Sequence, residues 1–94
     1  MNAGSAPAWD TLSVALLNSG DLKGAEEALT KSIAINPDDP QTHVHMAQVY
    51  VKKQDFARAQ PLVESLLAKE SELSTEDRDA LHALRREIRA KGSM

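Results

Sequence analysis

Three histidines are the residues of this chain best suited to metal binding, and their spacing argues against it. His43 and His45 are two residues apart, so in a helix their side chains point to different faces and cannot easily chelate one ion. His82 lies far from both in the sequence. The chain has no cysteine, so it offers neither a thiolate ligand nor a disulfide. We therefore expect no metal site and no cofactor.

Neighbouring carboxylates are the next candidates for chemistry, because a pair of them can act as general acid and base. They occur at Glu26-Glu27 and at Asp38-Asp39. Both pairs fall at exposed helix or loop positions, where helix capping or solubility is the usual role. The sequence contains no Ser-His-Asp spacing, no glycine-rich phosphate loop and no nucleophile elbow. We predict that this chain alone is not an enzyme.

Basic residues gather near the end of the chain, at Arg85, Arg86, Arg89 and Lys91. They could grip an acidic partner or a phosphate, but a solvated face on a last helix is the simpler interpretation, and their charge suits the end of a helix dipole. Over the whole chain the net charge is −3 and the pI is about 5.5, which gives no electrostatic case for nucleic acid.

The same sequence gives no sign of a membrane segment. No apolar run approaches the roughly 18 residues that a membrane-spanning helix needs. The residues at 1–5 are small and polar and do not resemble a signal peptide. We expect no membrane insertion and a soluble protein, with the cytoplasm as the default location.

Apolar periodicity and turn residues together predict five helices. Two consecutive helices are separated at Gly20-Asp21 and again at Asn36-Pro37. The segment from Ser74 to Asp77 resembles a capping box at the start of the last helix. Pro61 is expected to bend its helix without breaking it. The expected helices are about Ala8–Ser19, Leu22–Ile35, Pro40–Lys53, Phe56–Lys69 and a last helix ending near Ala90.

The first four of these helices form two units, because residues 6–39 and 40–73 share one layout at a period of 34 residues. Small residues at Ser13, Ala25, Ala47 and Ala59 are expected where helices cross closely, and large ones fill the seams beside them. Trp9, Leu12 and Leu16 are expected to be buried. The pairs that keep their size class are Leu12/Met46, Ser13/Ala47, Leu16/Tyr50, Leu22/Phe56, Leu29/Val63 and Ile33/Leu67; the identities are Asp21/Asp55, Ala25/Ala59 and Ala34/Ala68.

This pattern resembles the tetratricopeptide repeat. The first unit matches it at Trp9, Leu12, Ala15, Leu16, Gly20, Asp21, Leu22, Ala25, Leu29, Ile33 and Pro37. The second unit matches it at Ala47, Tyr50, Asp55, Phe56, Ala59 and Leu67. The second unit departs from it at His43, Gln54 and Ser71, where the family has Trp, Gly and Pro.

The resemblance implies an all-α fold, a right-handed α-solenoid of two antiparallel helix hairpins closed by a fifth, capping helix. The implied division is a flexible N-terminus at 1–5, repeats at 6–39 and 40–73, the capping helix at 74–90 and a flexible tail at 91–94. It also implies a concave groove that binds a peptide or a partner protein. The residues expected to line it are Asp10, Val14, Leu17, Asn18, Gln41, Val44, Gln48, Val51, Lys52, Arg78, His82 and Arg85, with Arg86 as a marginal member.

Two further expectations concern the kind of partner. The family's carboxylate clamp for chaperone C-termini needs Lys, Asn and Arg at places that here hold Asp10, Val14, His45, Thr75 and Asp79, so we predict no binding of that kind. The alternative to groove binding is assembly, in which this segment self-associates or packs within a longer array. The first helix carries little outward charge, which favours an open apolar edge there.

Overall fold

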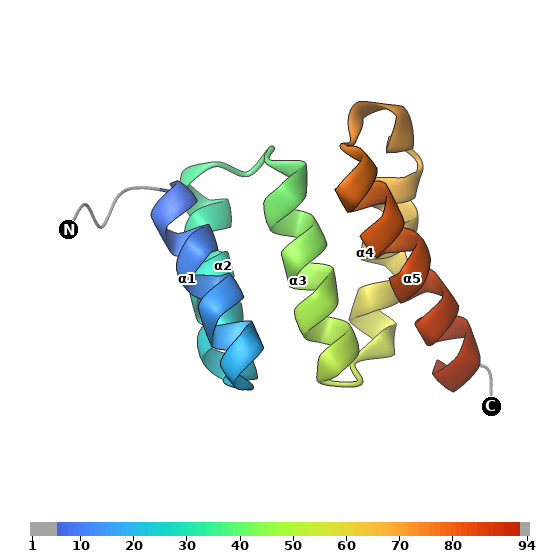
Figure 1. Ribbon diagram of the computed structural model, residues 1–94, viewed down its shortest axis with the longest axis horizontal. Coiled ribbons are helices and arrows are strands. Elements are labelled where there is room, and N and C mark those ends of the chain that lie inside the picture. Colours follow the sequence, from blue (N-terminus) through green and yellow to red (C-terminus); the bar gives the residue numbers. More distant parts are fainter. Residues whose placement is uncertain (1–5, 93–94) are drawn as a thin grey trace.

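The computed structural model describes residues 6–92, and every regular element in that part of the chain is helical (Figure 1). Residues 1–5 and 93–94, expected to be loose ends, lie outside the described residues. The elements in chain order are α1 (Ala6–Ser19), α2 (Leu22–Ile35), α3 (Pro40–Lys52), α4 (Phe56–Leu67), a 3-10 turn η1 (Glu70–Glu72) and α5 (Thr75–Gly92).

The predicted number and order of helices are confirmed, and their ends differ by one or two residues. α1 begins earlier than predicted, at Ala6, and α5 runs on to Gly92. α4 passes through Pro61 without a break and ends at Leu67, before the predicted end. The N–H of Lys69 donates to the carbonyl of Leu66, so the chain tightens into a 3-10 turn there.

The two hairpin turns are built by the same backbone hydrogen bonds 34 residues apart. In the first turn the N–H groups of Gly20 and Asp21 donate to the carbonyls of Leu17 and Leu16. In the second turn the N–H groups of Gln54 and Asp55 donate to the carbonyls of Val51 and Tyr50, and all four bonds are 2.8–3.1 Å long. This is the Schellman arrangement that ends a helix with a residue in the left-handed conformation. That residue is Gly20 in the first turn, with φ of 89°, and Gln54 in the second, with φ of 61°.

Each helix after the first begins with a side-chain cap. The carboxylates of Asp21, Asp39 and Asp55 accept from backbone N–H groups in the first turns of α2, α3 and α4. Ser74 does the same for α5, where its hydroxyl oxygen accepts from the N–H of Asp77 at 3.1 Å. The expected capping role of these residues is therefore present in the structure.

α3 lies between the α1–α2 hairpin and the α4–α5 pair, and it contributes to a hydrophobic cluster on each side (Figure 1). The cluster toward α2 contains Ala25, Leu29, Met46 and Val49, with Leu16, Leu17 and Ile33 partly buried against it. The cluster toward α4 and α5 contains Val44, Ala47, Val51, Ala59, Val63, Leu66, Leu73, Leu81 and Ile88. Ala25, Ala47 and Ala59 are fully buried, as the repeat pattern predicts for close helix crossings.

Of the core residues predicted on α1, Trp9 and Leu16 are only partly buried and Leu12 is exposed. Leu12 is 41% exposed, whereas Met46, its equivalent in the second repeat, is 6% exposed. The difference has a simple cause. Met46 faces the preceding hairpin and packs in the cluster with Leu29, while no hairpin precedes Leu12 in the described residues.

The left-handed turn residues generate the first prediction. A non-glycine residue in this conformation costs about 1–2 kcal/mol, so we expect Gln54→Gly to raise the free energy of unfolding by about 0.5–1 kcal/mol. The reciprocal control is Gly20→Ala, which should lower it by about 1 kcal/mol through backbone strain alone. No atom lies within 4 Å of the added Cβ at Gly20. Urea denaturation measures both, and no change in either variant would contradict this account of the turns.

The buried alanines generate the second prediction. Ala59→Leu should lower the free energy of unfolding by about 1–3 kcal/mol, because the close crossing has no room for a larger side chain. The matched control is Ala57→Leu on the exposed side of the same helix, where we expect a change within about 0.5 kcal/mol. Equal effects at the two positions would show that Ala59 is not at a tight crossing.

Candidate functional site

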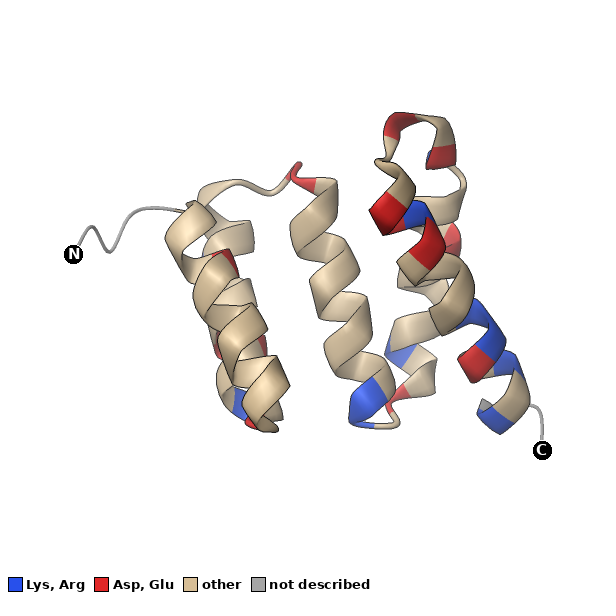
Figure 2. Ribbon diagram, viewed as in Figure 1, with Lys and Arg blue, Asp and Glu red and all other residues tan. Residues whose placement is uncertain are grey.

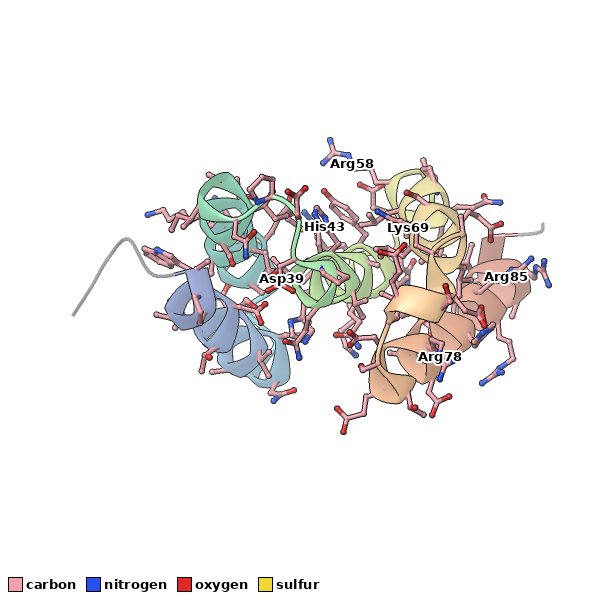
Figure 3. All side chains as sticks on the ribbon, turned by 90° about the horizontal axis from the view of Figure 1, so that it is seen from above. Asp39, His43, Arg58, Lys69, Arg78 and Arg85 are labelled. Carbon is pink, nitrogen blue, oxygen red and sulfur yellow. The ribbon has the colours of Figure 1, made fainter. Side chains whose placement is uncertain are left out.

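The predicted groove corresponds to the face formed by α1, α3 and α5, which we call the front face. In Figure 1 these helices lie nearest the viewer, with α2 behind α1 and α4 behind α5. The view from above shows the same order, with α3 between the two pairs (Figure 3). The other side of the molecule, formed by α2 and α4, is called the back face.

The predicted residues of α1 form one stripe. Asp10, Val14 and Leu17 follow one another at spacings of four and three residues, which places them on one side of the helix, and Asn18 lies beside Leu17. Val14 is half-buried and Asn18 is exposed. Leu17 packs against the cluster that contains Met46 and Val49, so it serves the core as well as the surface.

A hydrogen bond joins this stripe to a second one on α3. The Nδ1 atom of His45 lies 2.8 Å from the Oδ1 atom of Asp10, and both side chains are mostly buried. The predicted residues Gln41, Gln48 and Lys52 share a side of α3 with His45, because they are spaced by four, three and four residues. The two stripes therefore lie side by side on the front face.

The prediction that two residues of α3, Val44 and Val51, line the groove was wrong. Val44 and Val51 are only 1% and 2% exposed, because α5 packs on that side of α3 and covers them in the cluster with Leu81 and Ile88. The sequence did contain the signal for this. α3 has apolar side chains on two sides, which is typical of a helix packed between two neighbours.

Two of the three residues predicted on α5, His82 and Arg85, face η1 and α4. Arg85 forms an ion pair with Glu64 of α4 at 3.2 Å, without the alignment of a hydrogen bond, and Figure 3 shows Arg85 on the side of α5 remote from α3. His82 lies 3.4 Å from Glu70 of η1. The guanidinium of Arg78 donates a hydrogen bond to the hydroxyl oxygen of Thr75 in its own helix, with an N–O distance of 3.4 Å. Arg85 and His82 thus do not join the stripes of α1 and α3, because their partners lie on α4 and η1.

Charge is unevenly distributed on the front face. α1 contains one charged residue, Asp10, and α3 contains one lysine, Lys52, whereas α5 contains many residues of both signs (Figure 2). The α1 and α3 stripes are therefore mainly neutral and polar, and Val14 and Leu17 are their apolar residues. Of the four apolar residues predicted to line the groove, Val14, Leu17, Val44 and Val51, only the first two remain at this surface.

The back face has a hollow that the sequence did not indicate. It is a cleft of about 590 Å³ between α2 and α4, whose apolar lining includes Ile33, Met46, Tyr50 and Leu62. Arg58 also lines it, with its guanidinium carbon 5.9 Å from the centre of the Tyr50 ring. The repeat pattern assigned Met46 and Tyr50 to the core, and the structure leaves Tyr50 half-buried at this cleft.

Within residues 6–92 no three histidine or acidic side chains come together in a way that could hold a metal ion. Each of the helices in this range is also too short or too polar to cross a membrane.

Comparison with known proteins places this architecture in a class and then in a family. Stacked antiparallel helix hairpins with a recurring turn define a helical-repeat protein. The sequence pattern of the tetratricopeptide repeat matches residues 16–88, and the chain belongs to that family. Repeats of this family generally mediate protein–protein interaction and are themselves non-catalytic. Neither the curated proteins nor the solved structures include a match to this chain.

The Asp10–His45 contact generates the third prediction. In a double-mutant cycle with Asp10→Ala and His45→Ala, we expect a coupling free energy of about 0.5–1.5 kcal/mol, because the bond is shielded from water and joins two helices. The control cycle uses Asn18→Ala and Gln48→Ala on the same helices, whose side chains share no hydrogen bond in the described structure. Thermal or urea denaturation supplies the values. Equal coupling in both cycles would contradict a specific Asp10–His45 link.

Proposed function

We propose that this domain binds an extended segment of a partner protein on the front face, across the α1 and α3 stripes. The observation that carries the proposal is the Asp10–His45 bond at 2.8 Å, which sets the two stripes beside each other. The surface then offers Asn18, Gln41 and Gln48 as polar groups and Val14 as an apolar contact.

The chemistry of these side chains suits a peptide backbone. A side-chain amide has both a donor and an acceptor, and an extended segment has free N–H and C=O groups along its length. The side-chain amides of Asn18, Gln41 and Gln48 make no hydrogen bond in the described structure, so they can bind a partner without breaking one. The partner segment would carry few charges where it crosses α1 and α3, since those helices are nearly neutral.

The same geometry argues against a terminal carboxylate as the ligand. At the place where the family's clamp presents Lys and Asn, this chain has a carboxylate already bonded to an imidazole. A second carboxylate there would meet the charge of Asp10. Groove binding through Val44 or Val51 is not proposed, because both are buried.

The fourth prediction tests this proposal. Peptides selected from a random library on the immobilised domain should shift the NMR signals of Asn18, Gln41 and Gln48 in the labelled protein. Gln48→Arg should weaken their binding about tenfold or more, equivalent to about 1.4 kcal/mol, by adding bulk and charge to the stripe. The matched control is Gln60→Arg at an exposed position of α4, which should leave affinity unchanged.

Two results would contradict it. One is a set of shifts confined to the back-face cleft around Ile33, Tyr50 and Arg58. The other is unchanged affinity in Gln48→Arg with the protein still folded by circular dichroism.

A further inference from the structure

The outer side of the first hairpin is apolar and uncovered. Leu12 of α1 is 41% exposed and Ile35 of α2 is 44% exposed, and they are the large hydrophobic residues left exposed in the described part of the chain. Trp9 lies one turn before Leu12, Lys31 lies one turn before Ile35, and the Lys31 amine sits 4.6 Å from the centre of the Trp9 ring. These four residues therefore share one side of the hairpin, which we call the N-terminal edge.

The second repeat shows how such a side is normally covered. Met46 of α3 is the equivalent of Leu12, and it is buried because it packs in one cluster with Ala25 and Leu29 of α2. At Leu12 the N-terminal edge thus has the layout of a surface that, elsewhere in this same chain, packs against a helix. It lacks that helix in the described residues.

The opposite end of the molecule does not complement the N-terminal edge. Val63, the equivalent of Leu29, is 1% exposed because α5 packs with α4 in the cluster that contains it. The outer side of α4 and α5 carries the Arg85–Glu64 ion pair instead, with Arg89 beside it. Stacking copies head to tail would press apolar Leu12 and Ile35 against these charges and remove the charges from water, which is costly.

We propose that the N-terminal edge is a self-association surface, on which a second copy of this chain docks edge to edge about a two-fold axis. In that arrangement Leu12 and Ile35 of each copy face those of the other, and apolar surface meets apolar surface. Two antiparallel helix pairs then form one four-helix layer. Glu27 precedes Lys31 by one helical turn, so the rim carries both signs and each Lys31 can meet the other copy's Glu27.

The size of the edge limits the area that a dimer can bury. The end of the molecule measures 29 by 19 Å across the long axis, which limits the surface buried to about 550 Å² per copy and about 1,100 Å² for the pair. That total lies at the low end for specific interfaces, where complexes are weak and transient. We therefore expect a weak dimer that dissociates on dilution.

Sedimentation velocity over a concentration series tests the proposal, and this is the fifth prediction. The unmodified chain should pass from monomer to dimer and stop there. Leu12→Glu and Ile35→Glu should each weaken dimerisation at least about tenfold, by placing a charge in the apolar contact. Ala57→Glu, at an exposed site on α4, is the matched control and should dimerise normally. The edge sites are exposed, so circular dichroism should show all variants folded.

Single cysteines test the symmetry, because the chain has none of its own. Spin labels at Ala15→Cys on α1 should show a shorter distance between copies than labels at Arg86→Cys on α5. A chain that stays monomeric at every concentration, one that continues to larger assemblies, or one whose Arg86→Cys labels lie closer together would overturn the proposal. A dimer unaffected by both glutamate variants would overturn it as well.

Discussion

The close crossing of helices at small residues is the constraint on which the rest of the structure depends. Ala25, Ala47 and Ala59 are fully buried, and Ser13 is nearly so. Because no large side chain separates the helices at these points, neighbouring helices approach closely and the larger residues beside them interlock. Met46 and Leu29 fill one seam, and Val63 and Leu81 fill the next. The position of each front-face residue follows from this stacking.

The sequence predicted the helices and the repeat well because their signals are local. Asp21 and Asp55 begin helices by capping their first turns, and Gly20 ends one by its left-handed conformation. Gln54 takes that conformation although the residue type does not favour it, since the hydrogen bonds of the second turn are otherwise the same. Because the repeat has a period of 34 residues, the turn predicted at Gly20 also predicted the equivalent turn at Gln54.

The candidate site was harder to predict because it depends on how α5 folds back. The family resemblance assigned Asp10, Val14, Gln41 and Gln48 to the groove, and in the structure these residues lie in the stripes of α1 and α3. It could not show that α5 covers Val44 and Val51, or that Arg85 turns to Glu64, since these are contacts between helices distant in sequence. The hydrogen bond between Asp10 and His45 joins residues 35 positions apart, and no local sequence pattern predicts it.

Stacking of this kind leaves two surfaces with different chemistry, a nearly neutral polar surface across the α1 and α3 stripes and an apolar edge at the first hairpin. Both depend on α3 being packed on two sides, by α2 and by α5. Nuclear Overhauser contacts between methyl groups measure that packing most directly. Packing of α3 on both sides predicts cross-peaks from Val44 or Val51 to Leu81 or Ile88, together with cross-peaks from Met46 to Leu29. Valine methyl groups on α3 that show no cross-peak to α5 and are broadened by a soluble paramagnetic probe would contradict it.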